Sequence, residues 1–294
     1  MWNEMILTAL ALFPAIVLGI FIYMKDRAEK EPKSLLLLLL AGGVIIVLPV
    51  LIAEIIAGVI IKAVFYVLSM LPGVGEIFMY HLYQFVTAFI GVALIEEGFK
   101  WLAMWLITSK NKNFNSLFDG IVYAVFVSLG FAAVENIKYV FNYGIGNAFD
   151  RMVTAVPAHV FFGILMGCYY SRWHITELAK KKEKELMEEG LIANPKKSFS
   201  GETVLVMSLL VPILAHGFYD YTCFVKEWWT IVVFIIFLVF LYVFCFKKVN
   251  KMSKTDTSDI RVADILILQK YPELMEYFVM QTKKEIEEEN GHAE

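Results

Sequence analysis

The chain has 294 residues, of which 59% are hydrophobic and 19% are charged, and its formal net charge is −3. Soluble domains are closer to half apolar and a quarter charged, and the excess here falls in long runs typical of helices in lipid. This composition excludes an ordinary soluble domain and gives no reason to expect a nucleic-acid partner. The three cysteines form no CxxC pair, which argues against a disulfide framework and a thiolate zinc site.

Apolar runs near 20 residues predict an all-α, multi-pass membrane protein with about seven transmembrane helices. In chain order the runs cover 3–24, 34–62, 82–107, 118–142, 151–172, 202–224 and 228–246. The first run lacks a basic leader and a small-residue cleavage site, so we interpret it as a retained span. The stretch 63–81 is expected to hold a turn and a partly embedded segment.

Lysines and arginines gather in the connections that follow the first, third, fifth and seventh spans. The positive-inside rule makes those connections cytoplasmic, so the N-terminus is predicted outside and the C-terminus inside. The chain then divides into a transmembrane core, 1–246, and a charged cytoplasmic tail, 247–294. A cytoplasmic loop at 173–201 is expected to form a short helix broken at Gly190 and Asn194-Pro195, and the tail to form an amphipathic helix near 260–268 before an acidic run.

Several ionisable side chains lie within the predicted spans. Each costs roughly 2.5–3.5 kcal/mol at mid-bilayer on insertion scales, so such groups face a bundle interior or a water-filled cavity and mark a functional site by default. For Asp220 and Lys138, snorkelling toward the outer interface is an equally good explanation. The set comprises Glu96, Glu97, Lys100, Glu135, Lys138, His159, His216 and Asp220.

Helical spacing relates these groups to one another. Glu96 and Lys100 are four residues apart and can pair, and His216 and Asp220 have the same spacing. Glu97 points about 100° away from Glu96 and is expected to face a different space.

Small residues accompany the histidine of the fifth span. His159, Gly163 and Gly167 form a stripe that lets a neighbouring helix approach closely. The predicted orientation places the acidic and imidazole groups of spans three to six near the bilayer centre or in its outer half.

The residue types suit two kinds of peptide hydrolysis. A glutamate can take a proton from water while a histidine and an amide such as Asn136 stabilise the oxyanion. Alternatively, two histidines and a glutamate form an open three-ligand zinc site, with a further glutamate as base. A proton-coupled transporter would also need buried acids and histidines, and a purely structural polar network is a third interpretation. The chain has no GxSxG, HExxH or P-loop motif.

At these residues the chain resembles the PrsW protease family, which is distantly similar to the CAAX-type prenyl-protein endopeptidases. The resemblance covers most of the region from about residue 90 to residue 222. It rests on four ordered blocks: EExxK at 96–100; DGIVY at 119–123 with FxxxEN at 131–136; 151–157 with His159 and Met166-Gly167; and Pro212 with HGxYD at 216–220.

The resemblance implies a membrane endopeptidase of the bacterial plasma membrane. It implies cleavage of a single-span membrane protein, an anti-sigma factor, near its extracytoplasmic side during an envelope-stress response. Similarity to the CAAX endopeptidases favours glutamate-activated water, with zinc as the alternative. The expected catalytic residues are Glu96, Glu97 and His159, with Glu135, His216 and Asn136 as further members and Lys100, Asp220 and Arg151 in support; in the zinc version the ligands come from His159, His216, Glu135 and Glu97.

Overall fold

The computed structural model describes residues 2–70, 73, 75–194, 196, 200–225, 227–281 and 283. Its described part is helical and contains seven helical segments long and apolar enough to cross a membrane, which confirms the predicted fold class. These segments are Glu4–Lys25, Lys33–Leu68, Glu76–Thr108, Asp119–Tyr143, Ile145–Glu188, Gly201–Phe224 and Trp228–Lys254.

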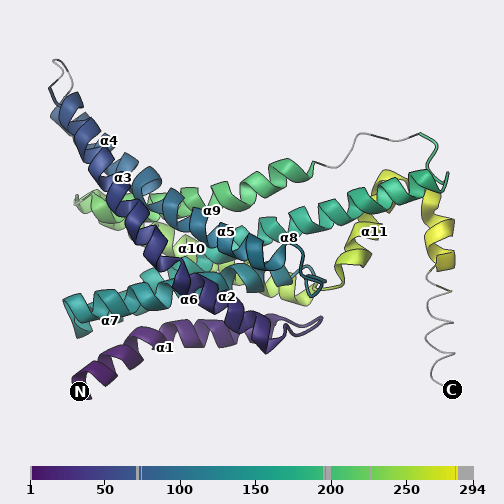
Figure 1. Cartoon of the computed structure of the whole chain (residues 1–294), viewed down its shortest axis with the longest axis horizontal. Helices are drawn as coiled ribbons and strands as arrows, with labels where there is room; N and C mark the ends of the chain where they lie inside the picture. The colour runs from purple at the N-terminus through teal and green to yellow at the C-terminus, as the bar shows by residue number, and fades with distance from the viewer. Residues whose placement is uncertain are drawn as a thin grey trace.

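The first three spans contain six helical elements (Figure 1). They are α1 (Trp2–Lys25), α2 (Lys33–Ile45), α3 (Val47–Leu68), α4 (Glu76–Val86), the π-helix η1 (Thr87–Ala93) and α5 (Leu94–Thr108). The second span breaks at Ile46, because Pro49 has no N–H for the preceding turn and its ring crowds the carbonyl of Ile45. The predicted turn lies between α3 and α4, where Leu71, Pro72 and Val74 are outside the described residues.

The remaining elements form the centre of the bundle and the C-terminal region. They are α6 (Asp119–Tyr143), α7 (Ile145–Val153), α8 (Ala155–Glu188), α9 (Gly201–Phe224), α10 (Trp228–Lys254), α11 (Asp259–Lys270) and the short 3₁₀ turn η2 (Pro272–Leu274). Helices α6 and α8 are the most deeply buried spans, and the other spans pack around them. The candidate site therefore rests on the most deeply buried spans of the fold.

Glycines allow α6 to approach its neighbours closely. A Cβ atom on Gly167 of α8 would lie 2.3 Å from the carbonyl oxygen of Gly120, and one on Gly130 would lie 2.1 Å from that of Leu40 on α2. A Cβ on Gly163 would lie 2.9 Å from the hydroxyl of Ser128. The predicted small-residue stripe on the fifth span is thus confirmed as the contact between α6 and α8.

The two polar segments of the chain pack against each other. Helix α8 continues without a break beyond its span to Glu188, so the first half of the predicted loop extends the fifth span and is not a separate helix. The break predicted at Gly190 is confirmed by its positive φ of 75°. The predicted amphipathic helix is α11, which packs on α8 through Ala263 and Ile267 and places Asp264 in an ion pair with Lys182. Pro195 and the acidic run at the end of the tail lie outside the described residues.

Connections rich in basic residues lie together at one end of the bundle. The α1–α2 and α5–α6 connections, the end of α8 and helix α11 are at the right in Figure 1, while the start of α1, the end of α3 and the start of α4 are at the left. This arrangement is the one that the positive-inside rule requires of a single cytoplasmic face. The orientation itself, and the division into core and tail at residue 246, stay predictions; α10 continues to Lys254.

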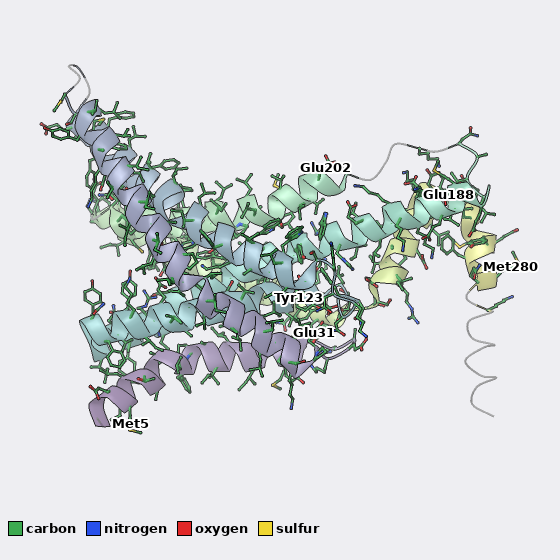
Figure 2. The ribbon with its side chains drawn as sticks, viewed as in Figure 1. Met5, Glu31, Tyr123, Glu188, Glu202 and Met280 are labelled. Carbon is green, nitrogen blue, oxygen red and sulfur yellow. The ribbon has the colours of Figure 1, made fainter. Side chains whose placement is uncertain are left out.

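A buried carboxyl cluster joins the α1–α2 connection to α6 at this end. The Tyr123 hydroxyl donates a hydrogen bond to Glu31 (2.8 Å), and the Glu31 backbone N–H donates one to Asp26 (3.3 Å) (Figure 2). Burial, followed by the nearby charge of Asp119, raises the pKa of Glu31 to about 8, and burial raises the pKa of Asp26 to about 6. The folded chain thus holds protons here that the unfolded chain releases.

We expect Glu31 to make stability fall with rising pH. A carboxyl whose pKa is higher in the folded state stabilises fully below its unfolded pKa, about 4.3, and loses that contribution as pH rises through about 8. Glu31→Gln should therefore stabilise the fold at pH 8, by a free energy on the order of 1–3 kcal/mol, and so raise the unfolding temperature there. At pH 4, where both forms of the chain hold the proton, the substitution should change the unfolding temperature little. Thermal unfolding in detergent measures this, with the exposed Glu29→Gln as control. An identical shift at both pH values would contradict it.

Candidate active site

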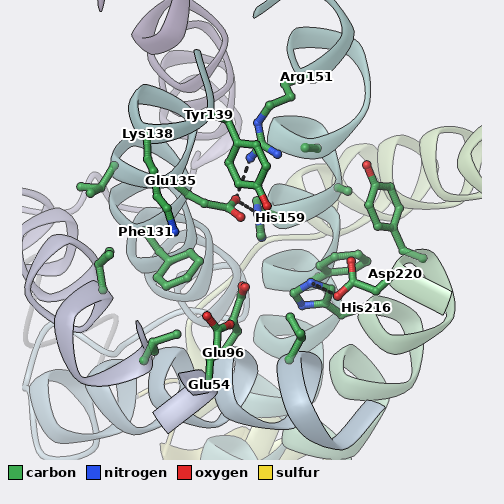
Figure 3. A pocket seen from close by; sticks show the side chains of 18 of the residues that line it. Glu54, Glu96, Phe131, Glu135, Lys138, Tyr139, Arg151, His159, His216 and Asp220 are labelled. Atoms are coloured by element: carbon green, nitrogen blue, oxygen red, sulfur yellow. Dashed lines mark hydrogen bonds and ion pairs between the residues drawn. The ribbon is translucent and has the colours of Figure 1, made fainter. Parts of the chain in front are cut away.

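A cavity of about 300 Å³ lies within the membrane-spanning part of the bundle. Helices α3, α5, α6, α7, α8 and α9 and the π-helix η1 all contribute side chains to its lining, so the polar groups of five different spans meet in one place (Figure 3). Its ionisable lining residues are Glu54, Glu96, Glu135, Lys138, Arg151, His159, His216 and Asp220.

The fully buried ammonium of Lys100 organises one wall of this cavity. Its Nζ donates hydrogen bonds to Glu96 Oε2 (2.9 Å) and Glu97 Oε1 (2.8 Å) and lies 3.2 Å from His159 Nδ1. The same nitrogen lies 4.3 Å from the centroid of the Phe131 ring, within cation–π range. The predicted pairing of Glu96 with Lys100 is confirmed, and all three donors of the ammonium have a partner.

Each imidazole is oriented by a carboxylate on another helix. Nδ1 of His216 lies 2.9 Å from Glu97 Oε1, and Nε2 of His159 lies 2.8 Å from Glu135 Oε2. The Arg151 guanidinium in turn donates to Glu135 (2.7 Å). These contacts fix the planes of the two rings. The other ring nitrogens have longer contacts: His159 Nδ1 lies 3.2 Å from Lys100 Nζ, and His216 Nε2 lies 3.4 Å from Asp220 Oδ2.

Glu96 and Glu97 face different spaces, as the helical spacing predicts. Glu96 lines the cavity, whereas Glu97 is fully buried and contacts His216 and Lys100 behind the cavity wall. The π-helix η1 ends at Ala93, just before this pair. A π-turn inserts one extra residue and rotates the helix that follows it, and π-turns are frequent at functional sites.

Asn136 is placed differently from the sequence prediction. Its amide nitrogen donates to the Ala11 carbonyl on α1 (2.7 Å), and its oxygen accepts from Arg151 Nε (2.8 Å). The side chain is buried and does not line the cavity. In this structure Asn136 therefore holds α1 and Arg151 in position, and its side chain does not reach the cavity.

Asp220 and Lys138 both line the cavity. Asp220 Oδ2 lies 3.4 Å from His216 Nε2, which brings it into the cluster through the predicted i,i+4 spacing. The Lys138 side chain remains exposed at the rim, so snorkelling still accounts for it.

Glu54 is the lining residue that the sequence analysis missed. It lies on α3, in the middle of the apolar run 34–62, where a carboxylate is as costly as in the other spans. A single charged residue within this apolar run was the signal that could have marked Glu54 as a site residue. Because Glu54 belongs to no recognised block, the spacing of the motifs could not point to it.

A family of known proteins matches most of the chain. The sequence model of a family described as "PrsW family intramembrane metalloprotease" matches residues 31–246. The chain belongs to the PrsW family. No solved structure matches it.

Curated relatives named Protease PrsW support the assignment. The protein from Clostridioides difficile (strain 630) is 29% identical over 82% of this chain and 89% of its own length. The Oceanobacillus iheyensis protein is 32% identical over 71% of this chain and 78% of its own length. The Bacillus subtilis (strain 168) protein is 29% identical over 84% of this chain and 95% of its own length. The chain is thus a multi-pass bacterial membrane peptidase that acts on a substrate within the lipid bilayer.

The family description implies a metal ion, and the residues present fit one. Glu96, His159 and His216 are buried, and each offers a ligand atom within 4.8 Å of the others. Two imidazoles and a carboxylate form a typical open zinc donor set. Metal-binding histidines usually give their other ring nitrogen to a carboxylate or carbonyl, which is what Glu97 and Glu135 provide here.

Proposed function

We propose that this cavity hydrolyses a peptide bond of a single-span membrane protein near its extracytoplasmic side, and that the substrate is an anti-sigma factor. The observation that carries the proposal is the convergence of Glu96, His159 and His216, from three different spans, in one cavity. A buried cluster of two imidazoles and a carboxylate beside an enclosed space is an arrangement suited to activating water for attack on a carbonyl.

In the proposed mechanism Glu96 takes a proton from a water molecule in the cavity, and the water oxygen attacks the carbonyl carbon. His216 lies where it can face the developing oxyanion, whereas both ring nitrogens of His159 are engaged by Lys100 and Glu135. Lys100 holds Glu96 in place, and Glu97 and Glu135 fix the two rings. Positioning of this kind lowers the barrier because the groups need not reorganise during the reaction.

A metal-dependent version is the second candidate, and the donor set of Glu96, His159 and His216 favours it. A bound zinc ion would supply Lewis-acid activation of the water and the carbonyl. In that version these three residues hold the ion, while the roles of Lys100, Glu97 and Glu135 are unchanged.

We expect the purified protein in proteoliposomes to cut a single-span substrate labelled at its extracytoplasmic end. Mass spectrometry of the product locates the cut, and metal analysis decides between the two versions. Stoichiometric zinc that is lost in His216→Ala establishes the metal version, and cleavage that withstands strong chelators establishes the glutamate version. Ion or solute flux without cleavage would show that the cavity serves a transporter.

A further inference from the structure

The carboxyl group of Glu54 has a place in the cavity that the mechanism above does not use. Helix α3 carries it into the space lined by Glu96, and Figure 3 shows the two carboxylates near each other. The same cavity is also lined by Glu135 and Lys138 of α6. Glu54 therefore lies among the reacting groups and not at a distant surface.

Glu54 differs from the other lining carboxylates in its partners. Glu96 is held by Lys100, Glu135 by Arg151 and His159, and Asp220 lies against His216. Within the described residues, no hydrogen bond or ion pair joins Glu54 to another side chain. Both of its oxygens are thus open to a molecule in the cavity.

A structural role does not account for this glutamate. The neighbouring positions on α3, Ile52, Ile55 and Ile56, are exposed and apolar, as expected of a surface in contact with lipid. A carboxyl group on such a helix is costly, and here no ion pair offsets the cost. Its position in the cavity points to a function there.

We propose that Glu54 is the general acid of the reaction. Two carboxyl groups in one site with different surroundings can divide the work of acid and base. Glu96, anchored by Lys100, takes the proton of the attacking water, and a protonated Glu54 gives its proton to the amide nitrogen as the C–N bond breaks. The proton on Glu96 then returns to Glu54, so one water is consumed for each bond cut. This inference rests on the proposed hydrolysis.

The test compares amide and ester substrates with the same single-span sequence and the same scissile position, in proteoliposomes. An amide nitrogen needs a proton to leave, whereas the alkoxide of a backbone ester is a far better leaving group and depends much less on one. We expect Glu54→Gln to reduce kcat for the amide about 100-fold or more and to reduce kcat for the ester far less.

The other outcomes overturn the inference in separate ways. Equal losses for amide and ester, or an increase in KM with unchanged kcat, would make Glu54 a substrate-positioning residue, and wild-type rates would leave it with no role. If Glu54→Gln does not fold, Glu54→Asp, which keeps the acid at a shorter reach, should show the same selective loss on the amide. A wild-type protein that cuts neither substrate would refute the proposed hydrolysis itself.

Discussion

Replacing Glu96 by glutamine is expected to reduce peptide cleavage by about 10²–10⁴-fold, the usual contribution of a positioned acid or base. Glutamine has the same shape and can still accept a hydrogen bond from Lys100, which keeps its second carboxylate partner, Glu97. The fold should therefore persist. In the metal version the same change also weakens ion binding, because one of the three donors is lost.

The measurement is the rate of product formation from the labelled single-span substrate, together with the thermal unfolding temperature in detergent. Glu202→Gln, the same change at an exposed position in the first turn of α9, is the matched control and should cut normally. Cleavage by Glu96→Gln at the wild-type rate would remove Glu96 from the mechanism, and the cavity would then need another base.

The spans could be predicted from sequence because the membrane imposes a simple rule of length and polarity on each helix. Contacts within one helix were equally accessible: the i,i+4 spacing predicted the pairing of Glu96 with Lys100 and of His216 with Asp220. The stripe of Gly163 and Gly167 was also readable, since only small residues allow such a close approach.

Contacts between helices were harder to predict. The pairing of Glu97 with His216, and of Asn136 with Ala11 on α1, depends on how separate helices rotate against each other, and spacing along one helix does not encode that rotation. The π-helix before Glu96 adds to the difficulty, because it changes the rotation of α5. The uninterrupted course of α8 to Glu188 was missed for a different reason: a Lys/Glu-rich segment has high helix propensity, and its polarity suggested a loop.

Removal of the Lys100 ammonium is expected to destabilise the fold by about 3–5 kcal/mol, the usual cost of breaking a buried ion pair by taking away one partner. Lys100→Met keeps a similar volume but leaves Glu97, which is fully buried, without its cation. Glu96 and His159 lose their hydrogen-bond donor in the same step. We therefore expect a marked fall in unfolding temperature in addition to the loss of cleavage.

A double substitution separates the charge from the packing. In Lys100→Met/Glu97→Gln the fully buried charge of Glu97 is gone, so part of the lost stability should return. Glu96 still lacks its cation and His216 loses the charge of Glu97, so cleavage should not recover. Lys138→Met is the control, because Lys138 lines the same cavity but its side chain is exposed. If Lys100→Met unfolded at the wild-type temperature, the contacts of Lys100 with Glu96, Glu97 and His159 would contribute nothing to stability.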